Sequence, residues 1–141
     1  MKLKQSVVHI GKQGTGGSVG YRSEVAFKCT AEAHNILLST AEMNKDLREF
    51  LLECENVELV NGEFGDPDLK RDTDGAYYWS YVKWYESYPC ISAFESIMDL
   101  LDEMALEDHY GFIRLGEDFD DHELRGDPGE FGMYINRNIE L

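Results

Sequence analysis

The sequence has 141 residues, 43% of them hydrophobic and 12% aromatic, and its 13 basic and 28 acidic residues give a formal net charge of −15. So many large apolar side chains can form a buried core, which excludes the disorder typical of highly charged tails. The acidic balance argues against direct binding of nucleic acid, because like charges repel phosphate, and it favours a basic protein partner.

The length is typical of one domain, so residues 1–141 are predicted to form a single domain. Residues 1–20 are predicted to be a mobile or loop-rich N-terminal segment, because five glycines fall within residues 11–20. Residues 1–10 contain lysines but no long apolar run, so no signal peptide is expected. No stretch is apolar enough to span a membrane, and we expect a cytoplasmic protein, located in the host cytoplasm if a phage encodes it.

The first regular element is expected within residues 21–38. Val25 and Phe27 are separated by one residue, as in the period-two pattern of a half-buried strand. The apolar run Ile36–Leu38 lies in the same stretch, and the pattern leaves open whether residues 30–35 continue the strand or break it.

The first helix is predicted to begin at Ser39. Ser39 and Glu42 have the spacing of a capping box, in which each side chain satisfies a free backbone amide of the other residue. Residues at helical spacing would form the apolar face of this helix, namely Met43, Leu47, Phe50, Leu51 and Cys54. The helix is expected to end at Asn56.

Two strands are predicted next. Val57–Val60 is followed by the tight-turn pair Asn61–Gly62, and residues 65–75 form a polar loop. Ala76–Tyr88 is rich in aromatic residues and gives the strongest strand pattern of the chain. Rings on both sides of this strand indicate either a central strand covered on two faces or one exposed aromatic face.

A second helix is predicted after Pro89, with Ser92 and Glu95 as its capping box. Its apolar stripe comprises Phe94, Ile97, Met98, Leu101, Met104 and Ala105. The last two strands are predicted at residues 110–115 and 130–136, joined by an acidic loop.

These elements predict an α+β fold, with two amphipathic helices packed on one face of an antiparallel β-sheet. The order of helix, strand, loop and strand occurs twice, which is compatible with two αββ units. No strand–helix–strand segment carries the glycine fingerprint of a nucleotide-binding fold.

The sequence offers no catalytic, metal-binding or nucleotide-binding signature. Cys29, Cys54 and Cys90 have no Cys-x-x-Cys spacing and are interpreted as reduced, small buried hydrophobic residues. Residues 11–20 lack the Lys-Ser/Thr ending of a P-loop, and the acidic stretch 117–123 lacks the glycine of a tight metal-ligand loop. We therefore predict no catalytic residue, metal ligand or cofactor.

The acidic residues are concentrated in residues 95–130, where thirteen carboxylates are opposed only by Arg114 and Arg125. On the predicted second helix they recur at steps of three and four, so they project together opposite the apolar stripe. The predicted partner-binding residues are Glu95, Asp99, Asp102, Glu103, Glu107, Asp108, Glu117, Asp118, Asp120, Asp121, Glu123 and Asp127.

An ordered acidic surface can occupy a basic groove that otherwise binds the closely spaced charges of duplex DNA. The functional hypothesis is therefore a non-enzymatic inhibitor that binds the basic surface of a nuclease or other nucleic-acid-processing protein. In composition and size it is similar to acidic DNA mimics, such as phage anti-restriction and anti-CRISPR proteins. Two alternatives stay open: a toxin-immunity or antitoxin-like binding protein, and a small enzyme with an acidic, metal-dependent site.

Overall fold

A computed structural model of the chain describes residues 8–10, 21–55, 58–59, 62–63 and 69–135. The regular elements of these ranges, in chain order, are β1 (Val8–Ile10), β2 (Ser23–Cys29), α1 (Ala31–Met43), α2 (Lys45–Leu52), β3 (Glu58–Leu59), β4 (Gly62–Glu63), β5 (Gly75–Val82), α3 (Pro89–Glu103), η1 (Glu107–His109), β6 (Tyr110–Leu115), β7 (His122–Gly126), η2 (Pro128–Phe131) and β8 (Met133–Ile135). No helix in the described ranges combines the length and apolar character needed to cross a membrane.

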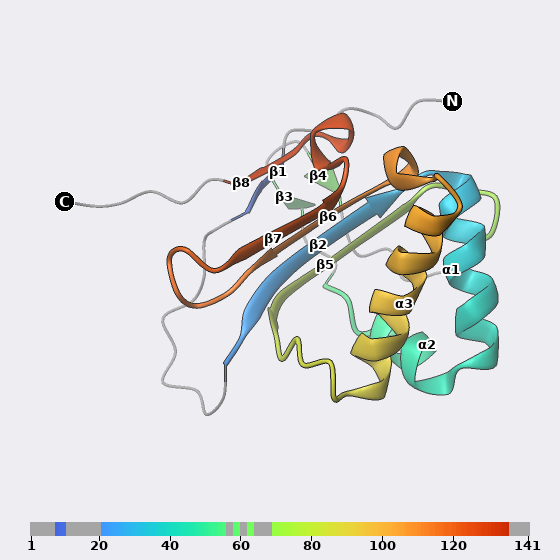
Figure 1. Ribbon diagram of the computed structural model, residues 1–141, viewed down its shortest axis with the longest axis horizontal. Helices are drawn as coiled ribbons and strands as arrows, with labels where there is room; N and C mark the ends of the chain where they lie inside the picture. The colour runs from blue at the N-terminus through green and yellow to red at the C-terminus, as the bar shows by residue number, and fades with distance from the viewer. Residues whose placement is uncertain (1–7, 11–20, 56–57, 60–61, 64–68, 136–141) are drawn as a thin grey trace.

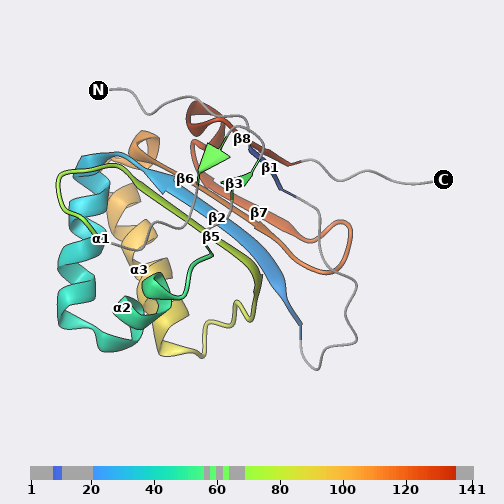
Figure 2. The same cartoon turned by 180° about the vertical axis from the view of Figure 1, so that it is seen from behind.

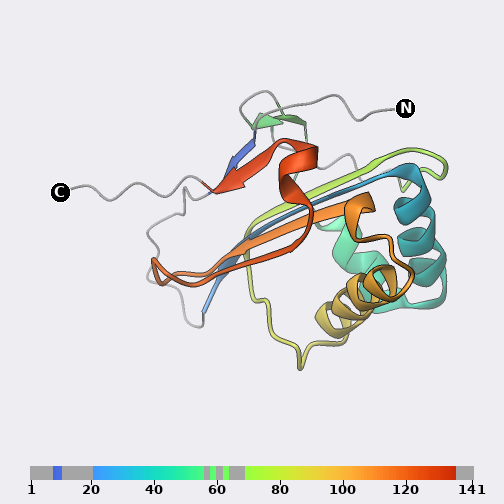
Figure 3. The same cartoon turned by 45° about the horizontal axis from the view of Figure 1, so that its top comes forward.

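The main sheet is antiparallel and has the strand order β5-β2-β6-β7. All three α-helices cover one face of this sheet (Figure 1, and Figure 2 from behind). The opposite face is covered by η2 and by the small parallel pair of β1 and β8, as Figure 3 shows. The predicted α+β fold is thus confirmed, with three helices on the sheet face instead of two.

Side chains alternate along the strands between two cores. In β2, Val25 and Phe27 point toward the helices, whereas Ala26 points to the other face. Phe94 of α3 packs edge-on against Phe27, with 4.9 Å between the ring centroids. The second core consists of Ala26, Tyr78, Ile113, Leu115, Phe131 and Met133. Both faces of the sheet are therefore buried.

The first helix begins earlier than predicted. Thr30 is its N-cap, and the Thr30 hydroxyl accepts a hydrogen bond from the backbone amide of Ala33. The run Ile36–Leu38, which had been assigned to the strand region, therefore lies inside α1. Ser39 and Glu42 do not form a capping box, because both accept hydrogen bonds from the Arg71 guanidinium.

A second cap divides the predicted first helix into two. The side-chain oxygen of Asn44 accepts a 3.1 Å hydrogen bond from the amide of Leu47, which starts α2. Leu47 and Phe50 are buried as predicted, but Met43 ends α1 and is 91% exposed. The predicted apolar face is therefore correct for α2 and wrong at Met43.

The strongest strand of the sequence analysis is shorter than predicted. β5 ends at Val82 and forms an edge of the main sheet, yet both of its faces are covered. Tyr77 and Trp79 point into the helix-side core, and Tyr78 points into the second core. Of the two arrangements considered for the aromatic strand, coverage on both faces is the one observed, although the strand is not central.

The helix α3 begins at Pro89 without a side-chain cap, so the predicted capping box of Ser92 and Glu95 is wrong. Proline is suited to the first helical position because its missing amide hydrogen has no partner there in any case. The predicted stripe is buried from Phe94 to Leu101. Met104 and Ala105 lie beyond the end of the helix and are exposed.

The last part of the chain differs most from the prediction. β6 has the predicted limits, but residues 122–126 of the predicted loop form β7, which pairs with β6. The predicted strand 130–136 is replaced by the end of η2 and by β8, and residue 136 lies outside the described residues. One αββ unit, α3–β6–β7, is present. In the other candidate unit, β3 pairs with β4 instead of β5.

Other predictions fall partly outside the described residues. The central turn residue Asn61, residues 65–68 of the predicted loop and most of the N-terminal segment belong to that part of the chain. Within the N-terminal segment, residues 8–10 form β1 and so interrupt the predicted loop. Cys29, Cys54 and Cys90 are free thiols. The first two are buried as expected, whereas Cys90 is only partly buried.

Candidate functional site

Arg125 of β7 gathers three of the predicted acidic residues of α3. Its guanidinium lies 2.9 Å from a carboxylate oxygen of Glu95, 2.8 Å from one of Asp99 and 2.9 Å from one of Asp102. These carboxylates share one face of α3 because they are four and three residues apart. The helix face predicted from spacing is therefore present, but the protein's own arginine contacts it.

Burial changes the pKa of Glu95, one of the three carboxylates that Arg125 contacts. Desolvation raises the pKa of Glu95, and the nearby charge of Glu123 adds to this, while hydrogen bonds from Trp84 and Arg125 oppose it. Trp84 donates its indole hydrogen to Glu95 over 2.8 Å. Glu95 thus belongs to a partly buried network and is less accessible to a partner than the sequence pattern suggested.

Arg114 of β6 forms the second cluster. Its guanidinium donates to both carboxylate oxygens of Asp121, at 2.9 and 3.3 Å, and to Glu123 at 3.2 Å. The hydroxyl of Tyr21 donates a 2.6 Å hydrogen bond to Asp121 and accepts one from the amide of Asp118. The turn between β6 and β7 is therefore ordered by its own carboxylates.

The other seven predicted residues are all exposed, namely Glu103, Glu107, Asp108, Glu117, Asp118, Asp120 and Asp127. One carboxylate oxygen of Glu117 accepts a 2.6 Å hydrogen bond from the backbone amide of Arg22. Asp108 lies 3.8 Å from a ring nitrogen of His109. Most of the negative charge of these seven residues consequently faces solvent.

The acidic residues are spread along the β6–β7 side of the molecule. In Figures 1 to 3 the turn between these strands projects from the end of the sheet that lies away from the helices. Glu107 and Asp108 lie at the other end of β6, and a six-residue strand is about 20 Å long. The predicted residues therefore form an elongated acidic band, not one compact patch.

Cys29 and His34 lie together in the buried core and do not form an accessible nucleophile. Both side chains pack against Gly75, since a Cβ at this glycine would lie 2.9 Å from the sulfur and 2.6 Å from the imidazole. Burial raises the pKa of the Cys29 thiol, which keeps it protonated. The imidazole donates to the carbonyl of Thr73 at 2.8 Å and accepts from the Tyr77 hydroxyl at 2.7 Å. This arrangement is that of a packed core.

Within the described part of the chain, no group of three or more His, Cys, Asp or Glu side chains is arranged to hold a metal ion. The carboxylates of residues 117–123 that were considered for metal binding include Glu117 and Asp121. Both accept hydrogen bonds from other parts of the same chain.

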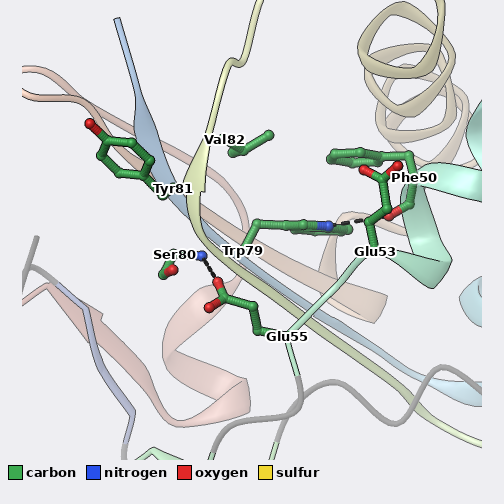
Figure 4. Close-up of a pocket in the computed structure, with 7 residues that line it drawn as sticks. All are labelled: Phe50, Glu53, Glu55, Trp79, Ser80, Tyr81 and Val82. Carbon is green, nitrogen blue, oxygen red and sulfur yellow. Dashed lines mark hydrogen bonds between the residues drawn. The ribbon is translucent and has the colours of Figure 1, made fainter. Parts of the chain in front are cut away.

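A cavity that the sequence analysis missed lies at the outer side of β5 (Figure 4). It has a volume of about 270 Å³ and is lined by Phe50, Glu53, Glu55, Trp79, Ser80, Tyr81 and Val82. Trp79 stacks on Phe50, with 4.4 Å between the ring centroids, and donates its indole hydrogen to the carbonyl of Phe50. Sequence reasoning could not pair these rings, because they lie on different elements far apart in the chain.

Fold and site together define an α+β protein whose antiparallel sheet carries an elongated acidic band along one side. Comparison of the chain with protein-family models, with curated proteins and with solved structures gave no significant match.

Proposed function

We propose that this protein is a non-enzymatic inhibitor that uses its acidic band to bind the basic nucleic-acid-binding surface of a nuclease or another nucleic-acid-processing protein. The observation that carries the proposal is the number of carboxylates of the acidic band that remain exposed to solvent. Arg114 and Arg125 contact five of the twelve predicted residues, and the other seven are exposed.

The internal ion pairs also give the band a defined shape. A guanidinium held by two or three carboxylates fixes the positions of those carboxylates, which a flexible acidic tail could not do. Fixed negative charges complement a groove that binds the regular phosphates of a duplex, and they accelerate encounter with a basic partner. A length of about 20 Å or more along β6 suits such a groove better than a compact patch would.

A charge-reversal variant tests the proposal. The substitutions to lysine are placed at exposed residues that do not contact Arg114 or Arg125, namely Glu103, Glu107, Asp120 and Asp127. We expect the wild-type protein, immobilised and exposed to a cell lysate, to capture nucleic-acid-binding proteins at low salt. Added duplex DNA and high salt should both release them, because exposed charges are screened within about 10 Å at 0.1 M salt. The variant should lose this capture.

The matched control places the same four charge reversals on the α2 side of the molecule, at the exposed residues Asp46, Glu49, Glu53 and Glu86. It has the same net charge as the first variant, so it should retain capture if the acidic band is the binding surface. Equal capture by wild type and the band variant would refute the proposal. Capture of a single toxin that duplex DNA does not displace would favour the immunity-protein alternative.

A further inference from the structure

In the part of the chain that the structure describes, the outer side of β7 is an open edge of the main sheet. Among the described residues, β7 pairs only with β6. The hydrogen bonds on either side of β7, from Gly116 to Asp121 and from Asp127 to Tyr110, show which residues direct their backbone toward β6. Because this direction alternates along an antiparallel strand, the amide and carbonyl groups of His122 and Leu124 point outward.

The other edge of the sheet is partly covered. The backbone amide of Glu55 donates to the carbonyl of Tyr78 at 2.8 Å, and the Glu55 carboxylate accepts from the amide of Ser80. The chain that follows α2 therefore satisfies backbone groups along β5. This contrast identifies β7 as the edge at which an added strand would find free hydrogen-bonding groups.

The two faces of β7 differ in chemistry. Glu123 and Arg125 point to the helix side, where Arg125 contacts the acidic face of α3. Leu124 lies on the opposite face beside Ile113 and is 53% exposed. A strand added at this edge would meet mostly negative charge on one face and an apolar side chain on the other.

The charge around the edge of β7 determines which kind of strand can bind there. Inward-pointing charged residues and a short length normally protect an edge strand from pairing with other strands. Here the flanking residues Asp120, Asp121 and Asp127 are acidic, so a second copy of this chain, with its net charge of −15, is repelled. A strand with basic side chains on one face is instead attracted.

On the basis of the proposed function, we propose that the outer edge of β7 binds an extended basic segment of the protein partner as an additional strand. Backbone hydrogen bonds to His122 and Leu124 would provide affinity. Lysine or arginine at alternate positions would lie over Glu123 and the acidic face of α3, and the intervening apolar residues would contact Leu124. The acidic band would then recognise a backbone as well as a charge.

Two synthetic peptides of alternating lysine and valine separate these contributions. In one peptide, alternate backbone amides are N-methylated, which removes hydrogen-bond donors from one edge and keeps the charge. We expect the unmethylated peptide to bind at least about tenfold more tightly by fluorescence anisotropy, since several backbone hydrogen bonds are lost in the other. Hydrogen exchange at the amides of His122 and Leu124 should slow when the unmethylated peptide binds.

The protein variant Leu124→Pro provides a second test. Proline is tolerated on an edge strand where its nitrogen faces solvent, and the substitution removes an outward amide without changing any charge. We expect the substitution to weaken binding of the unmethylated peptide and to leave the weak binding of the methylated peptide unchanged. Leu124→Ala is the control, because it keeps the backbone amide.

The outcomes distinguish the two proposals. Equal binding of both peptides, without protection of the two amides, would overturn the edge proposal and leave the acidic inhibitor standing. Failure of both peptides to bind at low salt would overturn both proposals. Protection of the Leu124 amide in concentrated protein without peptide would show that a second copy occupies the edge, and would overturn the basic-segment assignment.

Discussion

Gly126 ends β7 in a conformation that other residues rarely adopt. Its φ of +69° lies in the left-handed region, and a Cβ at this position would collide with the backbone carbonyl of Tyr110. The same residue starts the turn that brings Asp127 back to donate to Tyr110. The end of β7, and with it the direction of the chain into η2, depends on this glycine.

We therefore expect Gly126→Ala to destabilise the protein by at least about 1–2 kcal/mol, from the left-handed conformation alone. Gly129→Ala is the matched control, because a Cβ there would meet no atom within 4 Å. The control should change the free energy of unfolding by less than about 0.5 kcal/mol. Urea denaturation of both variants measures the difference, and equal stabilities would contradict the assigned role of Gly126.

Residue-scale patterns explain several wrong predictions as well. Ser39 and Glu42 have the spacing of a capping box, but Arg71 occupies both side chains. The actual cap, Thr30, has Ala33 three residues later, so the capping-box pattern could not detect it. A local motif shows only which bonds a side chain could form, and partners distant in the sequence decide which bonds it does form.

At the scale of elements, Arg125 joins α3 to β7 through three carboxylates. Glu95 is the most buried of the three, with 19% of its side chain exposed, against 66% for Asp99 and 43% for Asp102. Its pKa is raised by burial, so the folded state binds the proton of Glu95 more tightly than the unfolded state does. Ionisation of this residue consequently costs folding free energy.

The upward shift of the Glu95 pKa gives a testable dependence of stability on pH. The contribution of Glu95 to stability is greatest at low pH and is lost as the pH rises from the ordinary pKa of 4.5 through the raised value. Glu95→Gln retains the acceptor for Trp84 and cannot ionise, so its free energy of unfolding should fall less over this pH range. Urea denaturation between about pH 4 and pH 7 measures both slopes.

The control for this pH dependence is Glu103→Gln, which removes the same charge from the exposed last residue of α3. The free energy of unfolding of this variant should change with pH as that of the wild type does. A Glu95→Gln slope equal to that of the wild type would mean that Glu95 titrates alike in the folded and unfolded states.

Elements were predicted best where one side of the pattern is strongly apolar. β6 and the buried face of α3 were found because their apolar residues repeat at the period of the element. β7 was missed because its sequence, His-Glu-Leu-Arg-Gly, contains a single apolar residue. Its strand conformation comes from pairing with β6, and a local pattern does not contain that information.

The candidate site, like the elements, could be predicted from the sequence only in part. The concentration of carboxylates and the presence of Arg114 and Arg125 among them could be read from the sequence. The pairing of each arginine with particular carboxylates could not, because it depends on the register of β6 with β7 and on the position of α3. The sequence consequently predicted which carboxylates belong to the acidic surface but not how the fold arranges them along β6 and β7.

At the scale of the whole molecule, a net charge of −15 acts against folding. We expect the melting temperature to rise as salt is increased from about 10 mM to about 0.15 M, because the screening length falls from about 30 Å to about 8 Å. Differential scanning calorimetry at several salt concentrations measures this change. A melting temperature that falls with salt would mean that the ion pairs of Arg114 and Arg125 outweigh the overall repulsion.

The parallel pairing of β1 with β8 joins the first and last strands of the described chain, with Val8 opposite Met133. More than a hundred residues separate these partners, so their contact closes a long loop. During synthesis, β1 leaves the ribosome long before its partner exists, whereas the β6–β7 hairpin can form as soon as it emerges. The cover over the second core is therefore completed only after residues 133–135 have been made.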